Sequence, residues 1–395
     1  MIWEPTRAAG LARLDSFLPL AGRAYASNRN ADYGPDDRSN VSALSPWIRR
    51  RLITEEEVVA AVLRRHSFSA AEKFIQEVVW RTYWKGWLEM RPSVLWQFDA
   101  DRIALKDRLA EDGQLNRRFQ SAIEGRTGID CFDAWVAELI QHGWLHNHAR
   151  MWFASIWVFT LGLPWQLGAD FFYKHLLDAD PASNTLSWRW VAGLHTQGKH
   201  YLARAENIER NTLGRFNPAG HLNERAVPLY EDALVPTAGA VPSPQMVTAA
   251  KVALLLNEED LHPESWQLSA MVVAVAALPT QHVGAVDGPA MRFATGAISD
   301  ACERVARHFG LEVALAEPQA LADWAKQAGI TEIITGYAPV GLVARQLDGL
   351  TRDLAANGIR LVQLRRDWDS KAWPAATAGF FKVKAKIPAL IGHLS

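Results

Sequence analysis

Cysteine is scarce in this sequence. Only Cys131 and Cys302 occur among its 395 residues, which excludes a zinc or iron–sulfur site held by four thiolates. So few cysteines favour a reducing compartment. The longest apolar runs, such as residues 271–278, are far too short to span a bilayer. Residues 1–5 lack the charged and apolar regions of a signal peptide. We therefore expect a cytoplasmic protein with no bound metal and no membrane contact.

A net excess of either charge is also absent. The formal net charge is −1, and Lys+Arg balance Asp+Glu at 28 to 28 before residue 235 and at 14 to 15 after it. Without a general basic field, contact with nucleic acid requires a local patch. Three basic runs could supply phosphate contacts, although each is more often a solvated face: 49–51, 64–66 and 199–204.

The first part of the chain shows helical periodicity and no period-2 alternation. Thr54, followed by three glutamates, predicts a helix N-terminus. Ser69 with Glu72 predicts a capping box for a helix that runs to about Met90. Together with these, the predicted helices cover 8–18, 58–65, 115–124, 132–141, 147–161, 164–177 and 188–195. Residues 1–227 are thus expected to form an all-helical domain.

The composition changes after residue 227. Residues 228–250 are rich in proline and small residues and predict a linker. Beyond it, short apolar runs alternate with helical patterns, as in a doubly wound parallel sheet. The strands are predicted at 251–257, 271–278, 311–315, 332–335 and 359–364, and the helices at 299–308, 320–328 and 342–357. Residues 251–395 therefore predict a Rossmann-like α/β domain. No Gly-x-Gly-x-x-Gly follows the first strand, so a dinucleotide is not expected there.

Two segments in the helical part carry the most informative motifs. The first reads Gly-Trp-Leu-His-Asn-His-Ala-Arg-Met over residues 143–151, and it places Asn147, Arg150 and Met151 on one helical face. The second, residues 177–190, contains Asp178, Asp180, an amide and a Trp-Arg-Trp. This pattern resembles the flavin-binding core of the photolyase/cryptochrome family, which has Gly-Trp-x-His-Asn-x-x-Arg-Met, then Asp-x-Asp-x-Ala-x-Asn and Trp-x-Trp.

The order of the domains departs from that family. Its α/β domain comes first, whereas here residues 3–5 and 11–20 resemble the opening of the family's helical domain. Residues 380–384 resemble the end of its α/β domain. The resemblance thus implies a circularly permuted relative, with 228–250 joining the old end to the old beginning. It covers nearly all of 1–225 with specific motifs, and 250–390 only by topology and weak motifs.

The resemblance implies FAD as the cofactor. A loop with the sequence Val-Ser-Ala-Leu-Ser-Pro resembles the family's phosphate-binding loop, in which Val41 replaces the usual Thr. Taken alone, this loop is more often a simple turn with a helix cap. Asp-x-Asp alone would suit a calcium loop, but the Gly and terminal Glu are missing. The residues that match cofactor-binding positions are Tyr25, Val41, Ser42, Ala43, Leu44, Ser45, Phe74, Glu77, Arg81, Asn147, Arg150, Asp178, Asp180 and Asn184.

Particular roles follow from the resemblance. Arg150 and Asp178 would pair beside the flavin ring, Asp180 would accept from the flavin or ribose, and Asn184 would face the flavin N5. Trp188 and Trp165 match the first two members of an electron-transfer chain. Any single tryptophan is more often core packing. The third member of the electron-transfer chain is not evident, and the candidates are Trp135, Trp144, Trp152 and Trp157.

The same family positions predict a pocket for damaged DNA. Glu77, Trp80, Asn147, Met151 and Trp190 would contact an extruded pyrimidine dimer.

The implied enzyme is a deoxyribodipyrimidine photo-lyase, a carbon–carbon lyase. In it, light excites reduced FAD, an electron passes to a cyclobutane dimer in DNA, the ring splits and the electron returns. The alternative is a cryptochrome-like photoreceptor that reduces FAD in light but repairs nothing, which His148 in place of a usual Arg and the altered residues 185–187 favour. A FAD protein without a light function is a third interpretation. An antenna pigment is possible but has no support in the sequence.

Overall fold

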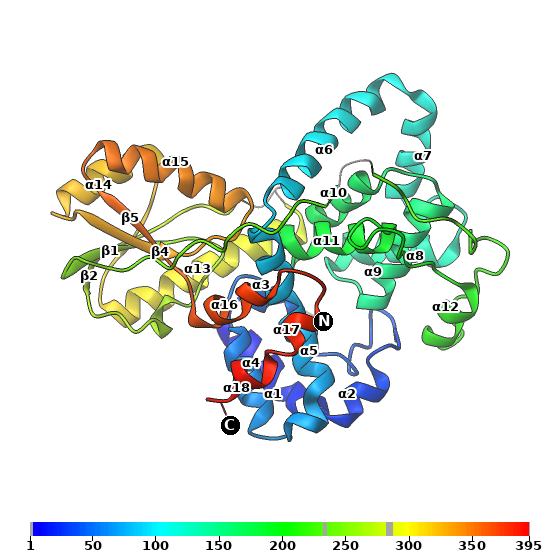
Figure 1. Ribbon diagram of the computed structural model, residues 1–395, viewed down its shortest axis with the longest axis horizontal. Helices are drawn as coiled ribbons and strands as arrows, with labels where there is room; N and C mark the ends of the chain where they lie inside the picture. The colour runs from blue at the N-terminus through cyan, green and yellow to red at the C-terminus, as the bar shows by residue number, and fades with distance from the viewer. Residues whose placement is uncertain (1–2, 232–234, 282–286, 395) are drawn as a thin grey trace.

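The computed structural model describes residues 3–231, 235–281 and 287–394. Helices come first along the chain, and a parallel sheet with its own helices follows (Figure 1). The helices up to Asn211 are α1 (Arg7–Phe17), α2 (Arg23–Asn28), α3 (Ser45–Arg49), α4 (Glu55–Leu63), α5 (Phe68–Glu89), α6 (Ser93–Glu111), α7 (Gly113–Ile123), α8 (Asp130–His142), α9 (Asn147–Ser155), α10 (Trp165–His175), α11 (Pro181–Ala192) and α12 (Ala205–Asn211). A single π-turn, η2 (Ile156–Thr160), continues α9.

The sheet has five parallel strands in the order β3-β2-β1-β4-β5. The alternating pattern predicted a doubly wound parallel sheet, and this strand order is typical of that class. The strands are β1 (Lys251–Leu256), β2 (Met271–Ala277), β3 (Val313–Leu315), β4 (Glu332–Gly336) and β5 (Arg360–Leu364). Three helices flank them: α13 (Pro289–Phe309), α14 (Leu321–Gln327) and α15 (Leu342–Ala356).

The two faces of β1 are buried in different cores. Val252, Leu254 and Leu256 belong to a large core shared with α13 and the helical part. Ala253 and Leu255 belong to a second core with α14 and α15. Because successive side chains of a strand point to opposite faces, a strand covered on both sides reads as one continuous apolar run. The sheet is therefore fixed between its own helices and the helical part.

The end of the chain returns to the helical part as α16 (Asp367–Ala372), η5 (Trp373–Ala375), α17 (Phe381–Lys384) and α18 (Ile387–Ile391). These elements lie beside α4 and α5 (Figure 1). The indole of Trp368 donates to the hydroxyl of Thr82 at 2.9 Å. His393 contacts Glu56 at 2.6 Å, and the neighbouring Glu57 accepts from Arg7 near the start of the chain. Both ends of the chain thus meet on α4.

Residues 212–250 contain no helix or strand in their described portion. The segment is nevertheless held in place by arginine side chains. Arg91 donates to the carbonyl of Pro236 at 2.9 Å, and Arg365 donates to that of Pro242 at 2.7 Å. Each bond ties a linker carbonyl to a different part of the fold. The predicted linker therefore follows a defined path over the protein at these contacts.

Several boundaries differ from the sequence-based prediction. The N-cap of α4 is Thr54, as predicted, and it forms a capping box with Glu57. The cap of α5 is Ser67, not Ser69; its side chain accepts from the N–H of Ala70. The predicted partner Glu72 instead accepts from Gln76 at 2.7 Å. Both serines are good caps, and the extended backbone of Ser67 decides between them.

Helix α11 was predicted to begin at Trp188, but it begins seven residues earlier, at Pro181. Asp180 is its N-cap, and Pro181 occupies the first helical position, where a missing N–H is tolerated. Helix α6 was not predicted at all. The earlier start of α11 matters for the site because Asp180, a predicted flavin contact, is also the N-cap of this helix.

Candidate functional site

Helix α5 supplies one wall of the predicted flavin site. Phe74 is 2 % exposed and packs on Phe17 and Tyr25, with ring centroids 5.4 and 5.2 Å away. One turn later, Glu77 forms an ion pair with Arg29, the C-cap residue of α2. Burial raises the pKa of Glu77, while the Arg29 charge opposes the shift. The structure therefore places an aromatic cluster below Glu77 and a cation beside it.

Arg29 is a site residue that sequence reasoning missed. It is the C-cap residue of α2, one helical turn after Tyr25, and both residues contact α5. Its backbone carbonyl contacts Nε2 of His146 at 3.1 Å, and Nδ1 of His146 accepts from the N–H of His148 at 3.2 Å. Nε2 must therefore carry the proton. Burial first of all lowers the pKa of His146 to about 4, so the ring is neutral at physiological pH. His146 thus ties α2 to the start of α9.

Helix α9 supplies the opposite wall. Arg150 and Asp178 form the ion pair expected from the sequence, with Nη1 3.1 Å from both carboxylate oxygens. Asn147 is exposed, and its Nδ2 lies 3.9 Å from the sulfur of Met151. The arginine of this face thus points to the buried carboxylate, whereas the amide and the thioether lie nearer the surface.

The carboxylate of Asp180 lies among three cations. Its Oδ2 is 3.6 Å from Arg81 Nη1, 3.6 Å from Lys85 Nζ and 3.7 Å from Arg49 Nε. Burial alone would raise the pKa of Asp180, but Lys85, Arg81 and Arg49 outweigh it and hold the pKa well below its usual range. Oδ1 accepts from the N–H of Ser183 at 2.7 Å. Asp180 is therefore ionised and caps α11.

Two buried atoms at this point lack hydrogen-bond partners in the described part of the chain. They are Oδ2 of Asp180 and Nη1 of Arg81. Their separation of 3.6 Å gives charge attraction without a hydrogen bond. Buried polar groups are rarely left in this state. An acceptor and a donor side by side fit a ligand with a polar edge.

The loop that resembles a phosphate-binding loop is fixed by Arg13. Its guanidinium donates to the carbonyls of Ser42 and Val41 at 2.7 and 2.6 Å. Ala43 has a positive φ of 50°, which is uncommon for a residue with a Cβ atom. Leu44 is buried at 1 % exposure, and the hydroxyl of Ser45 hydrogen-bonds Asp178. The loop is therefore linked directly to the Arg150–Asp178 pair.

Asn184 lies one turn into α11 and is buried. Its Nδ2 donates to the carbonyl of Ala169 on α10 at 2.7 Å. This bond orients the amide and leaves Oδ1 and the second N–H of Nδ2 for any other partner.

The two tryptophans predicted to carry electrons are both buried, at 2 % exposure for Trp188 and 3 % for Trp165. The ring of Trp165 stacks on Phe98 at 5.4 Å. The ring of Trp188 instead contacts Trp157 edge-to-face at 6.2 Å. Trp157 is itself fully buried, and its indole donates to the carbonyl of Pro164. Of the four candidates for a third tryptophan, Trp157 is thus the one in ring contact with Trp188.

The rings of Trp80 and Trp190, predicted to bracket a dimer, have other stacking partners. Trp80 stacks on Phe380 from the end of the chain, with centroids 3.9 Å apart and planes at 10°. Trp190 stacks on Tyr201 at 5.8 Å and 23°. Each ring is therefore already stacked on another residue of the protein, and the two rings do not form an empty slot for a dimer.

The basic run 49–51 does not form a nucleic-acid patch, and the prediction of phosphate contacts from it was wrong. Arg49, Arg50 and Arg51 are only 1–3 % exposed. They lie against the acidic run 258–260 that follows β1, in the pairs Arg49–Glu259, Arg50–Glu258 and Arg51–Asp260 at 2.7, 3.3 and 3.6 Å. Asp260 also accepts from Arg366 at 2.6 and 2.7 Å. We call these four arginines and three acids the interface charge cluster: Arg49, Arg50, Arg51, Arg366, Glu258, Glu259 and Asp260.

A histidine near the end of α11 gives a testable pH dependence. The ring of His195 lies 4.8 Å from that of Trp84 and 4.7 Å from that of Trp87, and its Nε2 is 3.1 Å from the hydroxyl of Tyr83. Burial, followed by nearby arginine charges, lowers the pKa of His195 to about 4 from 6.5. Between these pH values the unfolded chain binds a proton that the folded protein does not. The contribution of His195 to the free energy of unfolding is therefore fully present above pH 6.5, and it is lost as the pH drops toward 4.

We expect His195→Phe to flatten this dependence. Each pH unit contributes about 1.4 kcal/mol per group, so the loss of stability from about pH 7 to about pH 5 should shrink by about 2 kcal/mol. Urea unfolding at both pH values measures it. His221→Gln, at an exposed position, is the matched control. An unchanged pH dependence in His195→Phe would refute the assignment.

Within the described residues, no cluster of three or more His, Cys, Asp or Glu side chains is arranged to hold a metal ion. Among the same residues, no helix combines the length and apolar character needed to cross a bilayer.

Residues 74–251 match the family described as the FAD-binding domain of DNA photolyase. The deoxyribodipyrimidine photo-lyase of Vibrio cholerae serotype O1 is 28 % identical over 245 residues, 58 % of this chain and 51 % of that protein. The cryptochrome DASH of Idiomarina loihiensis is 27 % identical over 229 residues, 56 % of this chain and 49 % of that protein. The chain spans about half the length of these relatives.

Among solved structures, a bacterial class III photolyase from Agrobacterium tumefaciens is 29 % identical, with a TM-score of 0.44 over 53 % of this chain and 43 % of that one. The sequence matches support kinship with the photolyase/cryptochrome family through its FAD-binding domain, and they support FAD as the cofactor. The site fits this cofactor, because the unpartnered atoms of Asp180 and Arg81 offer an acceptor and a donor to a polar ring edge.

Proposed function

We propose that the protein is a light-dependent photolyase that uses FAD to repair cyclobutane pyrimidine dimers in DNA. The observation that carries this proposal is the unsatisfied polar edge formed by Asp180 and by Arg81 of α5, the helix that also carries Glu77. The relatives named deoxyribodipyrimidine photo-lyase support DNA dimers as the substrate. When bound, FAD would supply the light-driven electron, and the protein would supply binding and electrostatics.

Each wall would hold a part of the cofactor. The residues proposed to bind it are Tyr25, Val41, Ser42, Ala43, Leu44, Ser45, Phe74, Glu77, Arg81, Asn147, Arg150, Asp178, Asp180 and Asn184. The buried carboxylates stay ionised beside their arginines, so they can accept hydrogen bonds at any physiological pH. Asn184, oriented by the carbonyl of Ala169, would offer its oxygen to the flavin N5. Trp188 and Trp165 would carry electrons to the flavin.

A second group of residues would contact the dimer: Glu77, Trp80, Asn147, Met151 and Trp190. Trp80 would have to exchange Phe380 for a pyrimidine ring, whereas Trp190 would keep Tyr201 as its neighbour and contact the dimer with another part of its ring. Glu77 would accept from the dimer while Arg29 keeps it oriented. Four of these residues come from α5 and α9 and Trp190 comes from α11, so an extruded base would have side chains on several sides.

The proposed domains are a helical FAD-binding domain at 1–227, a linker at 228–250 and an α/β domain at 251–395. We also propose that the chain is a circular permutation of the family. Arg7 and His393 contact neighbouring glutamates of α4, so the first helix and the last described segment lie close in space, as this proposal requires. Permutation is tolerated where termini are close in space.

A blue-light photoreceptor without repair activity is the second candidate. Phe380 covers Trp80, and Tyr201 covers Trp190, which leaves less aromatic surface for a dimer. A cryptochrome DASH stands among the relatives. Light-driven flavin reduction without dimer repair would decide for this function.

The test is illumination of the reduced, FAD-loaded protein with dimer-containing single-stranded and duplex oligonucleotides. Restored thymine absorbance supports repair, and neither repair nor photoreduction would overturn both candidates. We expect Glu77→Gln to lower repair per bound flavin by about 10- to 100-fold, because a hydrogen bond to a charged group contributes about 1.5–3 kcal/mol. Glu72→Gln, on the outer side of the same helix, should repair like the wild type.

A further inference from the structure

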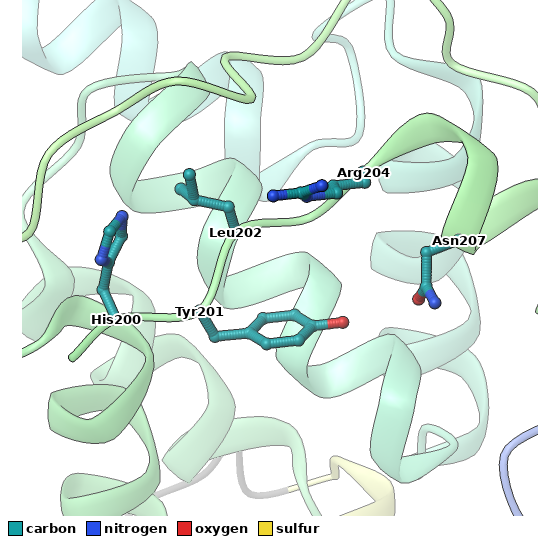
Figure 2. Close-up of a pocket in the computed structure, with 5 residues that line it drawn as sticks. All are labelled: His200, Tyr201, Leu202, Arg204 and Asn207. Atoms are coloured by element: carbon teal, nitrogen blue, oxygen red, sulfur yellow. The ribbon is translucent and has the colours of Figure 1, made fainter.

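A pocket of about 350 Å³ lies outside the proposed flavin site, after the end of α11. It is lined by His200, Tyr201, Leu202, Arg204 and Asn207 (Figure 2). An aromatic ring, an imidazole, a guanidinium and an amide thus surround one space. This set offers a stacking surface and hydrogen-bond donors, and it contains no carboxylate.

Arg204 is exposed and has no ion-pair or hydrogen-bond partner for its side chain in the described part of the chain. In contrast, Arg189 pairs with Glu231, and Arg210 lies 4.0 Å from Glu206. The guanidinium of Arg204 and the ring of Tyr201 border the pocket from two sides (Figure 2). A cation opposite an aromatic ring, with no anion of the protein beside it, is suited to an anionic planar ligand.

Tyr201 is held firmly in this position. Its N–H donates to the carbonyl of Val191 at 3.0 Å, and Trp152 hydrogen-bonds its hydroxyl. The indole of Trp152 also donates to Oδ1 of Asn207 at 3.0 Å. Because this bond uses the oxygen, the NH₂ group of Asn207 remains a donor for a ligand carbonyl.

The pocket is continuous with the proposed dimer site through aromatic contact. Tyr201 stacks on Trp190 at 5.8 Å and 23°. We propose that this pocket binds the nucleotide next to the dimer on the same DNA strand. Its base would stack on Tyr201, Asn207 would donate to a base carbonyl, and Arg204 would contact a phosphate. This assignment rests on the proposed photolyase function, and it adds a binding site for the part of the strand next to the dimer.

General physical chemistry supports this type of ligand. Proteins bind single strands through aromatic rings that stack on bases and cations that contact phosphates. The pocket is open to the surface, so a strand can enter and leave it. A nearly neutral protein depends more on such a local site, since no general field attracts DNA.

The experiment measures binding in the dark of the FAD-loaded protein to fluorescent single strands with one thymine dimer. One strand extends on both sides of the dimer, two others end at the dimer on the 5′ or the 3′ side, and a fourth has the full length without a dimer. We expect wild-type protein to bind one truncated strand about tenfold more weakly than the full strand. Arg204→Gln should remove this difference and reduce the dependence of log Kd on log salt by about 0.7, the value for one single-strand phosphate.

Two further variants separate stacking from charge. Tyr201→Leu should weaken binding of the full strand by about 5- to 100-fold, the range for loss of one base–aromatic stack, whereas Tyr201→Phe should change it little. Arg210→Gln removes an equal charge from the same segment and is the matched control. Flavin content and thermal unfolding report folding of each variant.

The outcomes distinguish the two proposals. If wild-type protein shows no preference for dimer-containing strands, the proposed function fails. If it shows this preference but Arg204→Gln and Arg210→Gln behave alike, the proposed function stands and the flanking-nucleotide site is refuted. An equal effect of both truncations would also refute it, because the pocket lies on one side of Trp190.

Discussion

Replacing Glu259 by glutamine is expected to lower the free energy of unfolding by about 3–5 kcal/mol, the usual loss when one member of a buried ion pair is removed. The substitution keeps the size and shape of the side chain and deletes only its charge. Urea unfolding followed by tryptophan fluorescence and far-UV circular dichroism measures the change. The effect should persist in high salt, because buried pairs are screened much less than exposed ones.

The geometry of the interface charge cluster explains this large effect. Both oxygens of Glu259 accept from Arg49 at 2.7 Å, and Lys85 Nζ lies 3.5 Å away. These side chains are 2–6 % exposed. Without Glu259, Arg49 and Lys85 would share the charge of Asp180 with Arg81. Two buried cations would then be poorly compensated at the contact between the helical part and the sheet.

A double-mutant cycle separates the pair from its surroundings. If Arg49 and Glu259 stabilise each other, the combined Arg49→Gln and Glu259→Gln protein should lose about 1–3 kcal/mol less than the sum of the single losses. Asp367→Asn breaks an exposed pair with Lys371 and should change stability by less than about 0.5 kcal/mol. Additive single losses, or a Glu259→Gln loss as small as that of the control, would contradict the expected coupling.

The arginines of this cluster show where sequence reasoning fails. A basic run is usually a solvated face, and Arg49–Arg51 gave no local sign of burial. Their partners stand more than 200 residues later, and pairing at that distance has no signature in periodicity or spacing. The signal that could have found it is the match between three arginines and the three acids at 258–260. In a sequence of net charge near zero, opposite runs of equal length are candidates for one interface.

Local chemistry was more predictable. Strand β1 was predicted correctly because residues buried on both faces form an apolar run, and the Arg150–Asp178 pair followed from the motif resemblance. The partners of aromatic rings could not be predicted in the same way. Trp80 stacks on Phe380, a contact between residues 300 positions apart. Helical spacing predicts which face carries a ring, but it does not predict what covers that ring.

The second large effect concerns FAD itself. We expect Asp180→Asn to purify with less than about a tenth of the wild-type flavin and to bind added FAD about 10- to 100-fold more weakly, as the loss of a charged hydrogen-bond acceptor predicts. Oδ2 of Asp180 is a buried acceptor without a hydrogen-bond partner in the described chain. In asparagine an NH₂ group takes its place beside Arg81 and Lys85, so an acceptor becomes a donor next to two cations.

This substitution is selective because it preserves the helix cap. The amide oxygen of asparagine can still accept from the N–H of Ser183, which Oδ1 of Asp180 does at 2.7 Å, and asparagine is among the best N-cap residues. Helix α11 should therefore keep its helical signal in circular dichroism while the flavin is lost. Asp15→Asn, on the exposed face of α1, should retain full flavin. A folded Asp180→Asn protein with wild-type flavin content and affinity would show that FAD does not contact this carboxylate. The polar edge at Asp180 and Arg81 would then need another ligand.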